Sequence, residues 1–266
     1  MNLTDWMVGG NRWARQKLGL NVKIPFDLDT HRLTAEDDRE RLVAGAGTSL
    51  ELLVFQKHGR VVDKWTHYPA IYEKHFSQYR GTDFKMLEIG VFRGGSLELW
   101  REYFGPDATI FGVDINPECA GFVDAPNQVR IGSQDDPAFL KSVVAEMGGV
   151  DVILDDGSHI ARHQIASFRA LFPLLNDGGL YCIEDIHTAY WPGGYEGGYR
   201  RPNTAIELAK GIIDDMHSWY HDRGAQWAPA DEVLAVHAYD SICVIEKGRR
   251  GRPASIRVGG AGKVST

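Results

Sequence analysis

The sequence predicts an α/β fold, a doubly wound and mostly parallel sheet of seven strands preceded by a helical N-terminal extension. Between Lys85 and Lys247, short apolar runs alternate with longer amphipathic segments, which is the pattern of strands joined by crossover helices. Near the end of this region, only a short polar turn separates two apolar runs. Because that turn is too short for a crossover, the terminal strand is expected to pair antiparallel.

The apolar runs place the strands at residues 86–89, 109–114, 128–131, 150–155, 179–184, 233–237 and 242–246. Amphipathic segments predict helices at residues 96–104, 137–147, 163–175 and 204–220. Two further helical stretches, 34–56 and 68–79, precede the first strand. We therefore divide the chain into a helical extension or lid (1–80), a main α/β domain (81–247) and a flexible basic tail (248–266).

The composition limits the classes of partner. The formal net charge of −7 lacks the basic footprint of a nucleic-acid-binding protein. Cys119, Cys182 and Cys243 are far apart and fit neither a disulfide framework nor thiolate metal spacing. The first residues do not resemble a signal peptide, and no apolar run has the length of a membrane span. We expect a cytoplasmic protein with a small-molecule partner, and the helical extension offers a surface for a homo-oligomer.

A glycine-containing loop connects the first strand to the next helix. Gly90 follows the strand and Gly94-Gly95-Ser96 open the helix, so bare backbone and a helix N-terminus face one ligand. A dinucleotide loop needs a glycine where this chain has Phe92, whose ring would keep a pyrophosphate off the backbone. The loop therefore favours S-adenosylmethionine over NAD. A tight strand-to-helix turn without a ligand is the simpler alternative.

Polar residues near this loop are candidates for contacts with the cofactor. Asp114 ends the second strand, roughly 20 residues after the loop, where acidic residues of such folds accept ribose hydroxyls. Gln134 and Asp135 follow the third strand and are placed to bracket an adenine. The expected cofactor-binding residues are Glu88, Gly90, Gly94, Ser96, Asp114, Gln134, Asp135 and Asp155.

Carboxylates follow the fourth and fifth strands at adjacent positions of the expected crevice. Asp155 and Asp156 end the fourth strand, and Glu184 and Asp185 end the fifth. Like charges this close repel one another unless a cation or a proton intervenes, and hard oxygen ligands suit magnesium. No thiolate or second clustered histidine suggests zinc. We expect Asp156, Glu184 and Asp185 to hold Mg²⁺ and Asp155 to face the cofactor; helix capping is the simpler alternative.

His159 lies three residues past Asp156, at the tip of the same loop. An imidazole suits removal of a proton from a hydroxyl near neutral pH. With magnesium polarising that hydroxyl, the oxygen can attack the sulfonium methyl group in line. The constellation therefore predicts methyl transfer to oxygen, with His159 as the catalytic base. A solvated surface histidine is the alternative.

Several motifs together resemble one known family. They are residues 87–90 with 94–96, the Asp-Asp-Gly-Ser-His run 155–159, and residues 178–181, 183–185 and 191–193, with residues 65–68 and 71–72 as a lead-in. Over about residues 60–222 the chain resembles the Rossmann-like, metal-dependent sugar O-methyltransferases that modify macrolide and anthracycline-type glycosides. The resemblance implies that the three carboxylates hold magnesium, which chelates two neighbouring sugar hydroxyls, and that the histidine is the general base.

The resemblance also bears on the acceptor. Mycinamicin-type enzymes carry a large additional N-terminal domain, whereas this sequence has a short helical one. Its compact layout is similar to the mycobacterial enzyme that methylates the 1-hydroxyl of 3-O-methylmannose oligosaccharides, so we expect a role in polysaccharide biosynthesis. An antibiotic deoxysugar, or a catechol or other phenol, is the alternative acceptor. A noncatalytic binding module or a nicotinamide enzyme on the same fold is a third hypothesis.

The loop 190–201 mixes aromatic rings with glycines. Such a loop suits a mobile lid that stacks on a sugar, and an ordinary surface loop is an equal alternative. Arg200 and Arg201 are expected to be a solvated basic pair. The expected acceptor contacts are His187, Tyr190 and Trp191.

Overall fold

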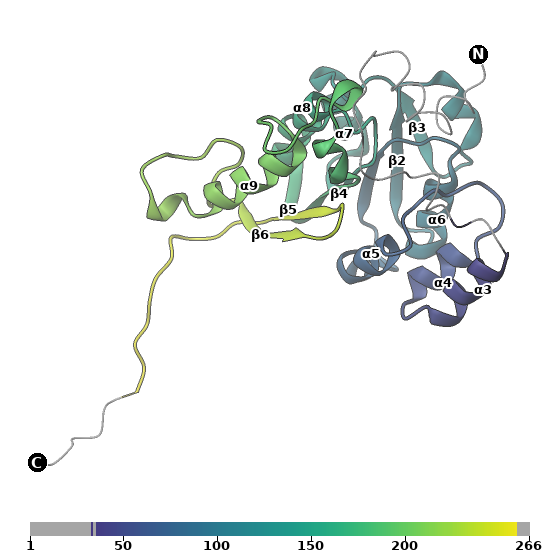
Figure 1. Ribbon diagram of the computed structural model, residues 1–266, viewed down its shortest axis with the longest axis horizontal. Helices are drawn as coiled ribbons and strands as arrows, with labels where there is room; N and C mark the ends of the chain where they lie inside the picture. Colours follow the sequence, from purple (N-terminus) through teal and green to yellow (C-terminus); the bar gives the residue numbers. More distant parts are fainter. Residues whose placement is uncertain (1–32, 34–35, 260–266) are drawn as a thin grey trace, which may run out of the picture.

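The computed structural model describes residue 33 and residues 36–259. Its strands are β1 (Lys85–Ile89), β2 (Thr109–Asp114), β3 (Gln128–Ile131), β4 (Val150–Asp155), β5 (Leu175–Ile183), β6 (Val233–Ala238) and β7 (Cys243–Lys247). Its helices are α3 (Glu36–Gly45), α4 (Ser49–Phe55), α5 (Tyr68–Phe76), α6 (Gly95–Phe104), α7 (Pro137–Met147), α8 (Ala161–Leu171) and α9 (Ala205–Met216). All seven predicted strands are present (Figure 1).

The strands form one sheet in the order β3-β2-β1-β4-β5-β7-β6. β1 pairs parallel with β2 and β4, and β5 pairs parallel with β4. β7 inserts antiparallel between β5 and β6, which confirms the predicted antiparallel pairing at the end of the chain. The carboxyl ends of β1, β2, β4 and β5 consequently meet at one edge of the sheet, where ligands bind in open α/β folds.

Helices cover both faces of the sheet, with α4, α5 and α6 on one face and α7, α8 and α9 on the other (Figure 1). Side chains along β5 show the alternation that produces two cores. Leu180 and Cys182 face the first group of helices, whereas Tyr181 and Ile183 face the second. The alternation of strand and helix segments along the sequence was therefore sufficient to predict these layers.

The N-terminal extension differs from the predicted single stretch over 34–56. Within the described residues, α3 ends at Gly45 and α4 begins at Ser49. Thr48 caps α4 by accepting a hydrogen bond from the backbone N–H of Glu51, and the Glu51 carboxylate accepts one from the Thr48 hydroxyl. The continuous helix was therefore a wrong prediction. The Thr-x-x-Glu pattern is a capping box, and it was the available signal for the break.

The extension shares its core with the main domain. Tyr72 and Phe76 of α5 are buried against α6, where the Tyr72 and Trp100 rings meet edge to face with centroids 5.4 Å apart. Phe76 also lies 6.2 Å from the ring of Phe104. Burial of such aromatic surface stabilises the contact in proportion to its area. The extension is therefore packed on the sheet's helical layer in the described residues, and the boundary at residue 80 stays a prediction.

Several segment limits were predicted incorrectly. α8 ends at Leu171, and a 3₁₀ turn (Phe172–Leu174) follows it, because Pro173 cannot continue an α-helix. β5 then begins at Leu175, four residues before the predicted start, with an irregularity in its pairing to β4 after Val150. α5 and α9 likewise end in 3₁₀ turns, Ser77–Tyr79 and Ser218–Tyr220. The strand and helix types were right, and the limits were set by local turn geometry.

The tail is held to the body as far as Arg250. The Arg250 backbone N–H donates to the carbonyl of Asp231 at 2.9 Å, and its Nε donates to the carbonyl of Ala230 at 2.7 Å. Residues 251–259 have no regular structure, are exposed and extend away from the body (Figure 1). In the described part of the chain, every helix is too short or too polar to cross a membrane.

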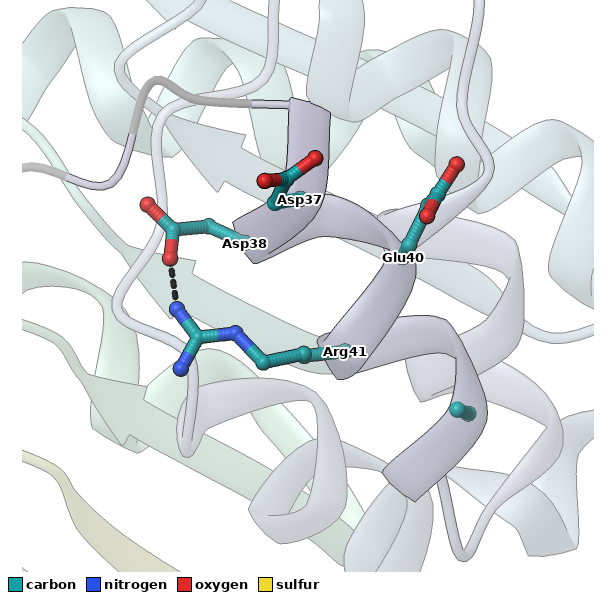
Figure 2. A pocket seen from close by; sticks show the side chains of 5 residues that line it. Asp37, Asp38, Glu40 and Arg41 are labelled. Atoms are coloured by element: carbon teal, nitrogen blue, oxygen red, sulfur yellow. Dashed lines mark hydrogen bonds and ion pairs between the residues drawn. The ribbon is translucent and has the colours of Figure 1, made fainter.

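An open pocket lies on the surface of α3, lined by Asp37, Asp38, Glu40 and Arg41 (Figure 2). Arg41 forms an ion pair with Asp38 on the same helix. All of these side chains come from one helix, and none is a predicted site residue. The pocket therefore contributes nothing to the site described below.

Candidate active site

The predicted base and two predicted metal ligands gather at the carboxyl edge of the sheet. Asp156, His159 and Asp185 each offer a ligand atom, and these atoms lie within 4.8 Å of one another. Nε2 of His159 is 3.8 Å from Oδ1 of Asp156 and 3.6 Å from Oδ2 of Asp185. Both distances are longer than a hydrogen bond, so the imidazole nitrogen faces two carboxylates and is hydrogen-bonded to neither.

Two of these residues have left-handed backbone conformations. His159 has φ of 55° and Asp185 has φ of 54°, and such conformations cost on the order of 1–3 kcal/mol in non-glycine residues. The hydroxyl of Thr188 donates to the carbonyl of His159 at 3.2 Å and to that of Asp185 at 2.8 Å. One side chain therefore links both strained positions and fixes the two functional groups relative to each other.

The third predicted ligand, Glu184, is paired with a lysine that the sequence analysis missed. Nζ of Lys64 lies 2.7 Å from Oε2 of Glu184 and also pairs with Asp156. Burial alone would lower the pKa of Lys64, but the carboxylates of Asp156 and Glu184 outweigh it and raise that pKa well above its usual value. The positive charge of Lys64 thus lies between two predicted metal ligands. It offsets the repulsion between their negative charges.

Lys64 belongs to residues 57–67, which we call the covering segment. In this segment, the backbone carbonyl of Val61 lies so close to the start of α6 that a Cβ on Gly95 would collide with it. Lys57 pairs with Glu98 of α6 at 2.7 Å. The segment therefore crosses the carboxyl edge of the sheet. No periodicity marks Lys64 in the sequence; the only signal was its position next to the family-like lead-in 65–68.

Tyr68, at the start of α5, was also missed. Its hydroxyl donates to Oδ1 of Asp185 at 2.5 Å, and the side chain is fully buried. Burial, followed by the charge of Asp185, raises the pKa of Tyr68, so the hydroxyl stays a donor. The N-terminal extension consequently supplies two groups, Lys64 and Tyr68, that hold the predicted metal ligands.

The expected acceptor residues divide into a buried and an exposed part. The ring of His187 meets Trp191 at 4.6 Å and Trp65 at 5.7 Å, edge to face in both cases, and burial lowers the pKa of His187. Trp191 is 6% exposed and packs on Tyr195, whereas Tyr190 is 46% exposed. Trp191 is therefore positioned to support the loop, and Tyr190 presents a ring at the surface. Arg200 and Arg201 are exposed, as expected for a solvated pair.

The glycine loop is constrained by protein contacts. Gly90 and Gly94 have φ of 97° and 72°. A Cβ on Gly90 would collide with the backbone carbonyl of Asp156, and one on Gly94 with that of Phe122. Only glycine satisfies both the conformation and the close approach. The loop therefore brings the ends of β1 and β4 into direct contact.

Asp114 connects the end of β2 to this loop. Its Oδ2 accepts hydrogen bonds from the backbone N–H groups of Val91 at 2.9 Å and Phe92 at 3.1 Å, while Oδ1 accepts one from Asn116 at 2.8 Å. The side chain remains partly exposed, and a carboxylate has about four lone pairs. Asp114 thus orders the loop and retains capacity for further donors, such as the ribose hydroxyls that we expected.

Glu88, near the end of β1, lies beneath the start of α6. It is fully buried, and Oε2 accepts a hydrogen bond from the hydroxyl of Ser96 at 2.9 Å. Oε1 is buried without a hydrogen-bond partner among the described residues. Burial raises the pKa of Glu88 to about 7. A direct contact of Glu88 with the cofactor therefore stays a prediction that this burial does not favour, and a contact of the partly buried Ser96 stays a prediction.

Asp155 and Gln134 have an interior role that we had not expected. Asp155 is fully buried and accepts hydrogen bonds from Gln134 at 2.9 Å, from Tyr181 at 3.2 Å and from Ser167. The other end of the Gln134 amide accepts one from the backbone of Ser158 at 2.7 Å. These bonds use both side chains and position the loop that carries His159, so a contact of Asp155 or Gln134 with the cofactor stays a prediction that this burial does not favour.

Asp135, the remaining predicted cofactor contact, is exposed and follows Gln134 directly in the sequence. Its Oδ2 lies 3.3 Å from Nε2 of His163. A hydrogen bond from Ser133 lowers the pKa of Asp135, and the charge of His163 adds to the effect. An ionised carboxylate is therefore available at the surface beside the end of β3.

Comparison with known proteins identifies the class. Residues 87–186 match the family model described as a methyltransferase domain. Together with the sheet order and the antiparallel β7, this match shows that the chain contains a methyltransferase domain of class I fold. The predicted methyltransferase fold is confirmed.

The chain is similar in sequence to named glycoside O-methyltransferases. It is 40% identical over 197 residues to the 8-demethyl-8-(2-methoxy-alpha-L-rhamnosyl)-tetracenomycin-C 3'-O-methyltransferase of Streptomyces olivaceus, covering 70% of this chain and 50% of the relative. It is 34% identical over 238 residues to the demethylmacrocin O-methyltransferase of Streptomyces fradiae, covering 83% and 59%. The chain thus spans between half and three fifths of the length of these relatives.

Solved structures show the same likeness. The MycE methyltransferase from the mycinamycin biosynthetic pathway, in complex with Mg, SAH and mycinamycin VI, superposes with a TM-score of 0.65 at 30% identity. The superposition covers 82% of this chain and 62% of that one. A second structure of MycE, with Mg and SAH, gives 0.62 at 35% identity over 68% of this chain and 48% of that one. The predicted resemblance to the sugar O-methyltransferases is confirmed.

Proposed function

We propose that this chain is a magnesium-dependent O-methyltransferase that moves a methyl group from S-adenosylmethionine to a sugar hydroxyl of a glycoside. The observation that carries the proposal is the position of His159, whose Nε2 faces Asp156 and Asp185 at 3.8 and 3.6 Å. A base beside two carboxylates suits deprotonation of a metal-bound hydroxyl. The names of the relatives and the titles of the MycE structures support the same chemistry.

The residues present fit a divalent cation. Asp156, Glu184 and Asp185 are hard oxygen donors at adjacent strand ends, and the Lys64 ammonium already occupies a position between two of them as a stand-in positive charge. We propose these three carboxylates as the magnesium ligands. Bound magnesium supplies the charge that lowers the pKa of coordinated sugar hydroxyls and holds neighbouring oxygens in place.

The protein groups around this site have distinct roles in the proposal. His159 accepts the hydroxyl proton at Nε2, while its Nδ1 is buried without a hydrogen-bond partner among the described residues. Tyr68 holds Asp185 through its hydroxyl. Thr188 fixes the backbone of both His159 and Asp185. Positioning of this kind removes much of the entropic barrier to reaction.

The cofactor is proposed to lie along the glycine loop beside Asp114. That side chain is partly exposed and holds the loop backbone through Val91 and Phe92. Gly90 and Gly94 shape the loop, and the exposed Asp135 is the proposed contact near adenine. The buried Asp155 and Gln134 support this arrangement from below.

The acceptor is proposed from the names of the relatives. Those named above act on a rhamnosyl tetracenomycin and on demethylmacrocin, and a further relative from Streptomyces antibioticus is an L-olivosyl-oleandolide 3-O-methyltransferase. A deoxysugar glycoside is therefore our first proposed acceptor, with His187 and Tyr190 at its site. The 3-O-methylmannoside that we first expected is the second. A cytoplasmic location, the homo-oligomer and the division at residues 80 and 247 stay predictions.

An acceptor screen tests the proposal. The full chain is incubated with methyl-labelled S-adenosylmethionine and Mg²⁺ in three separate reactions. Each reaction contains one acceptor, which is a rhamnoside, a 3-O-methylmannoside or a catechol. We expect label on a sugar oxygen, and loss of that label when a chelator is added. Label on the catechol alone, or equal sugar labelling in the presence of chelator, would contradict the proposal.

A further inference from the structure

A second group of metal-ligating side chains lies outside the active site. His75 of α5, His237 of β6 and Glu246 of β7 each offer one ligand atom, and these atoms lie within 4.8 Å of one another. Among the described residues, this group and the Asp156, His159 and Asp185 group are the two that meet this criterion. The two groups differ in chemistry, because the second offers two imidazoles and one carboxylate.

The β6–β7 hairpin places two of the three donors together. His237 pairs with Val244, and Glu246 pairs with Ala235, so the two side chains share one face of the hairpin at neighbouring rungs. Nε2 of His237 lies 2.6 Å from Oε1 of Glu246. This arrangement is set by backbone pairing and is therefore preorganised.

The third donor comes from α5, packed against the hairpin. The imidazole of His75 is centred 4.7 Å from that of His237 with an interplanar angle of 61°. Its Nε2 is 2.9 Å from the hydroxyl of Tyr239. An outer partner of this type fixes the ring orientation of metal-binding histidines in known sites.

One side chain of this group is buried and the other two are partly exposed. His75 is 6% exposed, and its burial, with the neighbouring His237, lowers the pKa of His75 to about 4. The side chains of His237 and Glu246 are 30% and 35% exposed, which leaves a route for an ion. The charge of Lys74, above the Tyr239 ring, opposes cation binding.

We propose that His75, His237 and Glu246 form a zinc site, with water as a fourth ligand. Two imidazoles and a carboxylate suit Zn²⁺ and related transition ions better than Mg²⁺. Tetrahedral zinc with bonds of about 2.1 Å needs ligand atoms about 3.4 Å apart, so the group requires only small side-chain rotations from separations within 4.8 Å. The sequence analysis weighed zinc only at the carboxylates of the active site and did not single out this group, because its two histidines meet only through tertiary packing.

The ion would join two elements that support the active site. α5 carries Tyr68, which holds Asp185. The turn between β6 and β7 carries Ser241, whose hydroxyl contacts Nδ1 of His187. Zinc at His75 and His237 would tie α5 to the hairpin and so stabilise both supports. The role is structural, and its direct readout is stability.

The test uses the full chain after removal of metals with a chelator and dialysis. Excess Mg²⁺ is included so that the carboxylates of the active site are not the preferred target of zinc. Zinc chloride is titrated by calorimetry, and the melting temperature is measured with and without zinc. Wild type is compared with His237→Gln and with Glu246→Gln, which keeps the shape of the glutamate and removes its charge. His221→Gln, an exposed histidine outside the group, is the matched control.

We expect wild type and His221→Gln to bind one zinc ion that both His237→Gln and Glu246→Gln bind at least tenfold more weakly. The zinc-induced rise in melting temperature should be lost in the same two variants, because a ligand that binds only the folded state stabilises it by mass action. Cobalt(II) bound in place of zinc should give the visible spectrum of a tetrahedral site. Equal zinc affinity and stabilisation in wild type and in whichever of the two variants folds would overturn the proposal.

Discussion

Lys64 reaches from the covering segment to the end of β5, where its Nζ lies 2.7 Å from Oε2 of Glu184. The same ammonium pairs with Asp156 at the end of β4. A residue of the N-terminal extension thus neutralises two carboxylates that we assign to magnesium. The lysine and the metal would offset the same negative charge, so the stability of this region should depend on which of them is present.

Replacement of Lys64 tests this relationship. Lys64→Met leaves Asp156 and the buried Glu184 without their cation, and loss of one partner of a buried ion pair costs on the order of 3 kcal/mol. We expect that destabilisation without magnesium and substantial recovery with it, measured by denaturant unfolding. Lys57→Met, which breaks the pair with the exposed Glu98, should cost less than about 1 kcal/mol and show no such recovery. Equal magnesium effects in both variants would contradict the account.

Removal of the proposed base separates sugar from phenol acceptors. His159→Ala should reduce methyl transfer to a glycoside by about 10²–10⁴-fold, the usual contribution of a general base. A phenol is acidic enough to react without that base, so a catechol acceptor should lose far less. Initial rates with labelled cofactor measure both. A glycoside rate that survives the substitution would remove His159 from the mechanism.

Asp114 tests the placement of the cofactor. Asp114→Ala removes the acceptor for the N–H groups of Val91 and Phe92 and the proposed contact with ribose. Loss of hydrogen bonds to a charged group should weaken S-adenosylmethionine binding by about tenfold or more, with the magnesium dependence unchanged. Calorimetry measures the binding of S-adenosylmethionine, and initial rates over a magnesium titration measure the magnesium dependence of methyl transfer. Asp107→Ala, an exposed acid before β2, is the control, and unaltered binding in Asp114→Ala would place the cofactor elsewhere.

Glu88 predicts a pH dependence of stability. Burial raises the pKa of Glu88 from 4.5 to about 7, so the folded protein keeps a proton that the unfolded chain releases. The stability from this group is complete below pH 4.5 and is lost as the pH rises through about 7. Glu88→Gln should therefore be more stable than wild type above pH 7, by on the order of 2 kcal/mol.

Chemical unfolding across this pH range measures the effect. The matched control is Glu98→Gln, which alters an exposed carboxyl on α6 and should give no gain that grows with pH. If Glu88→Gln is instead least stable above pH 7, then Glu88 is ionised in the folded protein and its unpaired Oε1 has a partner outside the described residues.

The strands and the antiparallel pairing at the end of the chain were predictable because their signals are local. Apolar runs with polar ends predicted β1 to β7, and the short turn after β6 predicted the antiparallel hairpin. α7 matches its predicted limits because Asp136 caps it, Pro137 begins it and Gly148 ends it. Asp156, His159 and Asp185 could be placed together because parallel strand ends share one edge.

The rest of the site depends on contacts between distant segments. Lys64 and Tyr68 reach the carboxylates only through packing of the covering segment and α5 on the sheet, and no sequence spacing reports that packing. The same holds for His75 and His237. Asp155 was placed at the cofactor because its position along β4 was known, whereas its full burial was not.

The central claim is metal-assisted methyl transfer at the Asp156 cluster, and one paired measurement on Asp156→Asn tests it most directly. S-adenosylmethionine affinity is measured by calorimetry, and transfer of labelled methyl to the glycoside acceptor is measured in the same preparation over a magnesium titration. We predict cofactor binding like that of wild type, with methyl transfer almost abolished and little restored by added magnesium. Methyl transfer at the wild-type rate with unchanged magnesium dependence would contradict the account.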